Sequence, residues 1–158
     1  MACVDEKLYS LNNPAVIIIE KGSDMLNFME LNFIAILIAA IAKFMIGVLW
    51  FSGLLFGKLW MAEVGLKVEN LTSPRNPMII AFLCNLLFAF TVAVIFSLLS
   101  LDFLGAVTIA VIIAIGISAA QMAPSFAFEG RSLKLFLIYA TLYVTEFVAV
   151  ACILTLLN

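Results

Sequence analysis

Two charged residues, Lys43 and Glu146, lie deep inside long apolar runs, where an ionisable side chain is costly and usually has a defined partner. Both runs are long enough to cross a membrane, and we expect them to cross it in opposite directions, so both side chains reach mid-membrane. We therefore expect Lys43 and Glu146 to contact each other. The pair has two interpretations: a structural ion pair or neutralised hydrogen bond, or a station in a proton or ion relay.

Four uncharged polar side chains are further candidates for contacts inside the protein. Tyr139 and Tyr143 share a helix face with Glu146, so we expect them to hydrogen-bond to its carboxylate. Asn85 and Gln121 lie nearer the cytoplasmic ends of their runs. Such side chains more often hydrogen-bond helices to each other than hold a substrate.

The residue types exclude most familiar active sites. The chain has no histidine, which removes bis-imidazole haem ligation, histidine-containing metal sites and the usual proton carrier at neutral pH. Cys84 and Cys152 lie inside apolar runs, where a thiol usually packs as a small hydrophobe, and Cys3 is far from both. No glycine-rich nucleotide-binding motif or nucleophile elbow occurs. We expect no enzymatic activity, catalytic residue, metal site or cofactor.

The composition identifies the class of protein. Of 158 residues, 66% are hydrophobic and 11% charged, with a net charge of −2. A soluble domain of this length buries only about 70% of the surface of its unfolded chain, so it cannot hide so much apolar area. A nucleic-acid-binding protein would need an excess of basic residues. The composition therefore indicates an integral membrane protein.

Four apolar runs reach the length of about 20 residues that a membrane-spanning helix needs, at residues 31–50, 78–101, 103–123 and 133–157. We predict an all-α, integral membrane four-helix bundle over residues 31–158, preceded by a polar N-terminal extension, residues 1–30. We expect Pro124 to stop the third run, because proline cannot continue the hydrogen-bond ladder of a helix. Asp102 alone separates the second and third runs, which predicts a tight hairpin.

Small or polar residues recur at a spacing of four in every run, a pattern typical of helix interfaces inside lipid. The stripes are Ala35, Ala39, Lys43 and Gly47; Ala81, Asn85, Ala89, Ala93 and Ser97; Ala106, Ala110, Ala114 and Ser118; and Thr141, Thr145 and Ala149. They predict a closely packed bundle. Gly53 and Gly57 have the same spacing, but they lie at a span boundary, where a turn is an equal alternative.

The orientation follows from basic residues near the spans. Lys58, Lys67, Arg75, Arg131 and Lys134 lie in or beside the first and third connections, whereas only Lys7 and Lys21 lie on the opposite side. Because cytoplasmic loops carry the excess of lysine and arginine, we expect connections 51–77 and 124–132 in the cytoplasm. Both termini then lie on the outer, non-cytoplasmic side of the cell (inner) membrane.

Two segments carry a family resemblance. Residues 47–61, GVLWFSGLLFGKLWM, are similar to a G-x-L-W-[YF]-S-x-x-x-F-G-K-x-W-M signature, and residues 128–136, FEGRSLKLF, are similar to F-E-G-R-x-L-K-L-F. Both signatures are typical of a family of small bacterial membrane proteins known as domain of unknown function 1761. The resemblance covers about residues 29–157 and implies four transmembrane helices and no established activity. The chain departs from the family at Lys43 and Glu146, where apolar or small residues are usual.

On the predicted topology, these two segments form one cytoplasmic interface cluster. Its members are Trp50, Phe56, Lys58, Trp60, Glu129, Arg131 and Lys134. We expect Lys58 to approach Glu129. The cluster is either a structural clasp between the first and third connections, or a surface on which Lys58, Arg131 and Lys134 bind an anionic headgroup or a partner.

Three functions remain at this stage. The first is a non-catalytic component that self-associates or serves as a small subunit of a membrane assembly, with membrane lipids and other subunits as partners and no nucleic acid. The second is an oligomeric conduit for a small solute or ion, with Lys43 and Glu146 near its path. The third, a lipid-acting enzyme, has the least support because no nucleophile–base pair is evident.

Overall fold

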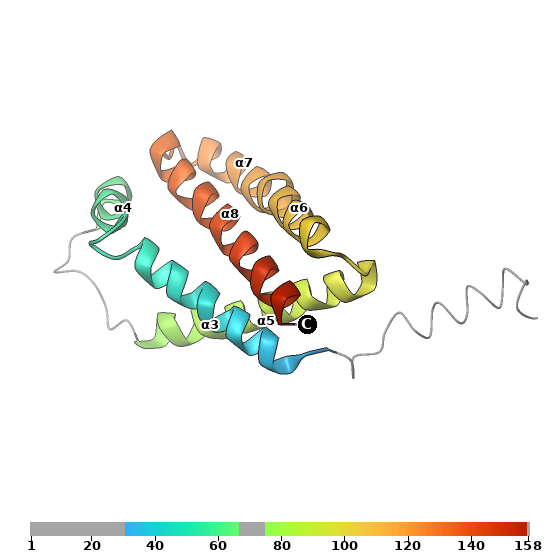
Figure 1. Ribbon diagram of the computed structural model, residues 1–158. Coiled ribbons are helices and arrows are strands. Elements are labelled where there is room, and N and C mark those ends of the chain that lie inside the picture. Colours follow the sequence, from blue (N-terminus) through green and yellow to red (C-terminus); the bar gives the residue numbers. More distant parts are fainter. Residues whose placement is uncertain (1–30, 67–74, 158) are drawn as a thin grey trace, which may run out of the picture.

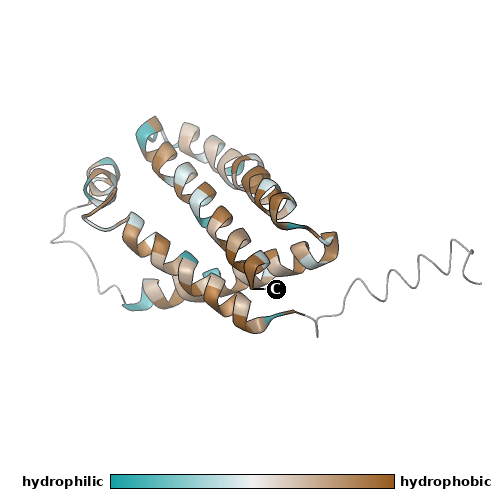
Figure 2. Cartoon of the chain, viewed as in Figure 1, coloured by the Kyte–Doolittle hydropathy of each residue, from teal (hydrophilic) through white to brown (hydrophobic). Residues whose placement is uncertain are grey.

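The computed structural model describes residues 31–66 and 75–157 and is helical throughout its regular structure (Figure 1). The membrane-length helices are α3 (Phe33–Trp50), α5 (Arg75–Leu99), the continuous helix α6–η3–α7 (Phe103–Ile113, Ala114–Ala119 and Ala120–Phe128) and α8 (Leu133–Leu156); α4 (Gly57–Val64) is a short helix between α3 and α5. Within the described residues, four helices are long and apolar enough to cross a membrane. Figure 2 shows that hydrophobic residues predominate along these helices. The all-α, four-span prediction is confirmed; the extension 1–30 lies outside the described residues.

Polar residues at the span boundaries begin the helices. Asn32 accepts hydrogen bonds from the backbone N–H groups of Ile34 and Ala35, and Asp102 accepts one from Gly105. Ser132 caps α8 in the same way. These caps satisfy donors that have no partner within the helix. The Asn32 amide also donates to the carbonyl of Leu157 at 2.8 Å, which ties the start of α3 to the end of α8.

Helix α8 is the centre of the packing. It lies between α3 and α6–η3, and α5 crosses behind them, packing mainly on α3 and also contacting α8 (Figure 1). Alanines fill the contacts, so the backbones approach closely. The completely buried side chains of this core are Ala35, Ala39, Ala40, Ala89, Ala106, Ala114, Val150 and Ala151. The expected close packing is therefore present in the first and third stripes and in part of the second.

The fourth stripe was predicted to face inward, and that prediction is wrong. Thr141 and Thr145 are exposed, whereas Leu135, Leu142 and Leu154 are among the buried side chains of α8. The central helix needs large side chains to fill the space between its neighbours. The threonine hydroxyls donate to the carbonyls of Leu137 and Thr141, so they need no partner on another helix.

The third span does not stop at Ala123, as the sequence suggested, but continues through Pro124 to Phe128. Proline removes one hydrogen bond, and membrane helices tolerate this loss where local π-helical adjustment re-satisfies the backbone. The π-helical segment η3 lies directly upstream. The connection to α8 is thus shorter than predicted, residues 129–132. Similarly, α5 begins at Arg75 rather than Met78, since Pro77 falls in its first turn, where a missing N–H costs little.

Gly57 is the first residue of α4 and closes the turn that follows α3. Of the two interpretations of the Gly53–Gly57 spacing, a helix-pairing motif or a turn, the structure therefore favours the turn. The Gly57 N–H donates to the carbonyl of Ser52 at 2.9 Å. A Cβ atom at this position would lie 2.3 Å from the carbonyl oxygen of Phe51 and 2.5 Å from that of Ser52, whereas a Cβ at Gly53 would meet nothing within 4 Å.

We predict that Gly57→Ala destabilises the protein by about 1–3 kcal/mol, because backbone atoms must move to admit the methyl group. Gly53→Ala is the matched control and is expected to leave stability unchanged. Unfolding of both variants in the same detergent, followed by circular dichroism, measures the difference. Equal stability of the two variants would contradict the turn geometry.

Candidate functional site

The charged centre of the protein is the ion pair between Lys43 of α3 and Glu146 of α8. The structure brings these two side chains together, with Lys43 Nζ 2.7 Å from Glu146 Oε2. Their side chains are only 11% and 7% exposed. A buried pair of this kind compensates for desolvation only when other polar contacts complete it.

Asn85 of α5 completes the pair. Its Oδ1 accepts a hydrogen bond from Lys43 Nζ at 2.8 Å, and the Phe88 ring lies below the same ammonium, 4.7 Å from nitrogen to centroid. An ammonium group has three hydrogens, so Lys43 is fully coordinated by a carboxylate, an amide oxygen and an aromatic face. We expected Asn85 nearer the cytoplasmic end of its span, but it lies at the depth of Lys43. A lysine deep in the membrane needs more than one hydrogen-bond acceptor. This requirement is the sequence signal from which Asn85 could have been identified as a partner.

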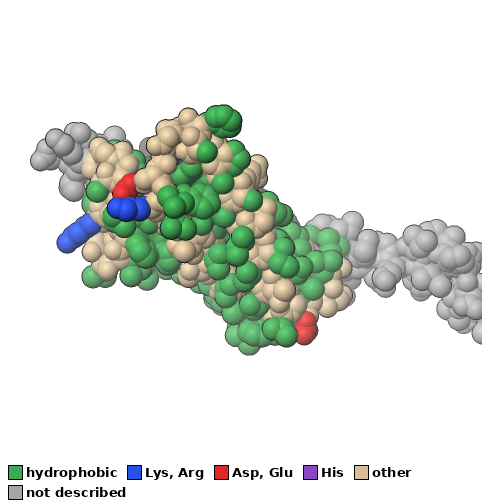
Figure 3. Space-filling view, turned by 90° about the horizontal axis from the view of Figure 1, so that it is seen from above, with side chains coloured by type: hydrophobic (Ala, Val, Ile, Leu, Met, Phe, Trp, Pro, Cys, Tyr) green, Lys and Arg blue, Asp and Glu red, His purple; other side chains and the backbone are tan. Residues whose placement is uncertain are grey.

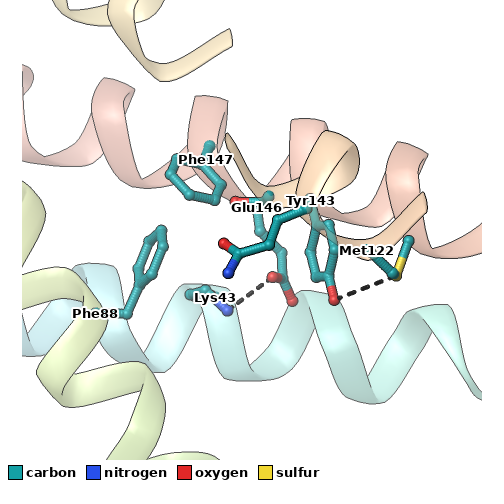
Figure 4. Close-up of a pocket in the computed structure, with 8 residues that line it drawn as sticks. Lys43, Phe88, Met122, Tyr143, Glu146 and Phe147 are labelled. Atoms are coloured by element: carbon teal, nitrogen blue, oxygen red, sulfur yellow. Dashed lines mark hydrogen bonds and ion pairs between the residues drawn. The ribbon is translucent and has the colours of Figure 1, made fainter. Parts of the chain in front are cut away.

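A polar cleft of about 390 Å³ opens beside this centre (Figure 4). It lies between α5 and η3–α7, which have no substantial contact with each other, with α3 and α8 as its floor. Its polar lining consists of Lys43, Ser118, Gln121, Tyr143 and Glu146, and its apolar lining of Phe88, Met122 and Phe147. The expected bundle contacts Gln121 and Tyr143 therefore meet the ion pair in one cleft.

Neither tyrosine hydrogen-bonds to Glu146, which corrects the expectation from helix spacing. The Tyr143 hydroxyl points to Met122 Sδ at 3.9 Å (Figure 4), and the Tyr139 hydroxyl accepts a hydrogen bond from Trp60 Nε1 at 2.8 Å. The Glu146 carboxylate turns instead to Lys43, because an ammonium is the stronger donor. Shared spacing places side chains on one face without determining where their ends point.

An aromatic clasp joins α4 to the start of α8. Trp50 Nε1 donates to the carbonyl of Ile138 at 3.1 Å, and the Phe51 ring packs against both Trp60 and Tyr139, at centroid distances of 5.2 and 5.6 Å. Ser132 also hydrogen-bonds to Glu63. The two signature segments thus meet mainly through aromatic side chains and hydrogen bonds.

The charged members of the interface cluster are arranged differently from the prediction. Glu129 pairs with Arg131 at 2.5 Å and not with Lys58, because the left-handed turn at Gly130 (φ +64°) brings its two neighbours together. Arg131 also stacks on Phe126, and Phe56 packs on Trp50. Lys58 and Lys134 are exposed at this end. In Figure 3 the visible charged side chains gather at the two ends of the molecule, with hydrophobic surface between them.

The fold and the charged centre define a four-span helical membrane protein with a polar cleft between its helices. More particularly, the chain belongs to the family described as protein of unknown function (DUF1761), whose model matches residues 34–155. This confirms the resemblance seen in the signature segments. No curated protein and no solved structure matches the chain.

We predict that Glu146→Leu or Lys43→Leu alone lowers the free energy of unfolding by about 3–5 kcal/mol, because each leaves an uncompensated charge in a low-dielectric site. The double replacement is expected to cost less than the sum of the two. Gln121→Leu, an exposed cleft residue, is the control and is expected to have little effect. Denaturant titration of the four variants in one detergent gives the coupling energy; additive losses would contradict a direct pair.

Proposed function

We propose that the protein is a non-catalytic membrane component that associates with a second copy of itself or with other membrane subunits. The outward stripe of α8 carries this proposal. Thr141 and Thr145 are exposed and small, with Ala149 half-buried one turn further on. In lipid, helices associate where small residues let their backbones approach, and this stripe is not used inside the bundle.

The state of the charged centre supports a non-catalytic role. The Lys43 ammonium is held by Glu146, Asn85 and the Phe88 ring, so its hydrogens are directed at groups of the protein itself, and as an ammonium it has no lone pair with which to act as a nucleophile. A general base needs a partner within hydrogen-bond reach of a reacting group. The Tyr143 hydroxyl beside the ion pair bonds instead to the sulfur of Met122.

We predict that Thr145→Cys, in a chain whose native cysteines are replaced, forms a disulfide-linked dimer in native membranes under mild oxidation. Two copies related by a twofold axis through this face bring the same position together. Ile112→Cys is the control, since Ile112 is 57% exposed but lies on α6. Cross-linking at position 112 and not at 145 would contradict the assigned surface.

A conduit is the second candidate, and the polar cleft is the observation that favours it. Ser118, Gln121 and Glu146 offer oxygen atoms inside the membrane-spanning region. Towards the end of the bundle near Asp102, however, the core is closed by Ala35, Val150 and other fully buried side chains. Passage would therefore need several copies. Ion flux in liposomes that is lost in the Lys43→Leu/Glu146→Leu variant would favour this candidate.

For the orientation, we propose that the end with the clasp faces the cytoplasm in the inner membrane, which leaves Asp102 outside. The support is the gathering of Lys58, Arg131 and Lys134 at the clasp end. Phe128, 93% exposed, and Phe103, 49% exposed, lie at opposite ends of the third span and suit cysteine labelling. Labelling of Phe128→Cys by an impermeant reagent on intact cells would overturn this orientation.

A further inference from the structure

The cleft beside the ion pair has unused hydrogen-bonding capacity, and most of it is acceptor capacity. Lys43, the only cation in its lining, is fully coordinated. Among the described residues, only Lys43 donates to the Glu146 carboxylate, which has about four lone-pair sites. The cleft therefore presents a carboxylate with spare acceptor sites, and the one cation in its described lining is already paired with that carboxylate.

The rest of the polar lining also offers acceptors. The Tyr143 hydroxyl donates its hydrogen bond to the sulfur of Met122, which leaves the oxygen lone pairs open to the cleft. Gln121 and Ser118 make no side-chain hydrogen bond to the rest of the described chain, so the amide and the hydroxyl can accept as well as donate, and Gln121 is exposed. Polar groups inside a membrane need a polar partner. The partner that this lining fits is a hydrogen-bond donor, preferably a charged one.

Aromatic side chains form the other wall. Phe88 and Phe147 meet edge to face with centroids 4.5 Å apart, and the Tyr143 ring lies beside Glu146 (Figure 4). Aromatic faces attract ammonium groups and pack against alkyl chains. Aromatic rings that flank a carboxylate are complementary to a cation with an apolar body.

The cleft is also within reach of the membrane interface. Gln121 lies seven residues before Phe128, the last residue of α7, which corresponds to about 10 Å along the helix. An amphiphile can thus place its polar group in the cleft while its chain stays in the bilayer. The volume, about 390 Å³, suits a small amine or a lipid headgroup.

We propose that this cleft binds a primary ammonium group carried on an apolar chain, with the ammonium donating to Glu146, Gln121 and the Tyr143 oxygen. The group comes either from a free alkylamine or from an ethanolamine lipid headgroup. The site does not depend on self-association, because Tyr143 and Phe147 lie about 200° around α8 from Thr141 and Thr145 respectively.

The test uses the full chain in maltoside micelles, which contain no amine, and three probes of equal length: hexylamine, hexan-1-ol and hexanoate. Hexylamine is cationic at neutral pH and is expected to raise the thermal unfolding midpoint, because it binds only the folded protein. Hexanol and hexanoate are expected to leave the midpoint unchanged. Calorimetric titration with empty micelles as reference gives the affinity.

Variants of the lining identify the site. Glu146→Gln keeps the shape of the side chain but removes its charge, and we expect at least a tenfold loss of hexylamine affinity. Gln121→Leu combined with Tyr143→Phe leaves the ion pair intact and is expected to weaken binding several-fold. This variant decides the question if Glu146→Gln does not fold. Thr141→Val, on the opposite face of α8, is the control and should bind as the native chain does.

A second arm distinguishes the two sources of the ammonium group. Phosphatidylethanolamine added to the micelles should displace hexylamine if the headgroup is the occupant, whereas phosphatidylglycerol should not. No displacement by either lipid assigns the cleft to a free amine. The proposal is overturned if hexanol or hexanoate stabilises the protein as well as hexylamine does, if hexylamine has no effect, or if the lining variants bind it unchanged.

Discussion

One ammonium group, that of Lys43, holds the centre of this protein together. It joins α3 to Glu146 on α8 and to Asn85 on α5, and it lies over Phe88. In a bilayer these contacts replace water, which would otherwise have to follow the charge into the membrane. Because its partners lie on two other helices, Glu146 on α8 and Asn85 and Phe88 on α5, the ammonium sets the depth at which the three helices cross. We interpret the pair as fixing the relative positions of the helices more than as stabilising the fold. The desolvation penalty of two buried charges offsets much of their electrostatic attraction.

The remaining structure accommodates this centre. Towards one end, alanines on α3, α5 and α6 let the backbones close around α8. Towards the other end, α5 diverges from η3–α7 and leaves the cleft, while the aromatic clasp of α4 secures the start of α8. Gly47 leaves room for the Glu146 carboxylate, with a Cβ at that position 3.4 Å from Oε1. Close packing and an open polar cleft thus occupy separate parts of one small fold.

Much of this could be predicted from the sequence, because a bilayer imposes its thickness on every apolar run. The four spans and the meeting of Lys43 with Glu146 follow from length and depth alone. The direction of a side chain around its helix does not, because packing decides it. Thr141 and Thr145 face outward and Tyr139 turns to Trp60 for this reason. Glu129 pairs with Arg131 because of the left-handed turn at Gly130 between them. The π-helical segment before Pro124 shifts the register of the third span, and no residue type in the sequence predicts a π-helix there.

The central claim is that Lys43 and Glu146 form a direct contact in the bilayer, and a solid-state NMR distance measurement tests it most directly. Protein labelled with 15N at lysine Nζ and 13C at glutamate Cδ is reconstituted in lipid, and the dipolar dephasing between the two nuclei is recorded. The Lys43 Nζ to Glu146 Oε2 distance of 2.7 Å predicts strong dephasing of one glutamate signal, which Lys43→Leu removes. Dephasing that is absent, or that persists in Lys43→Leu, would contradict the account.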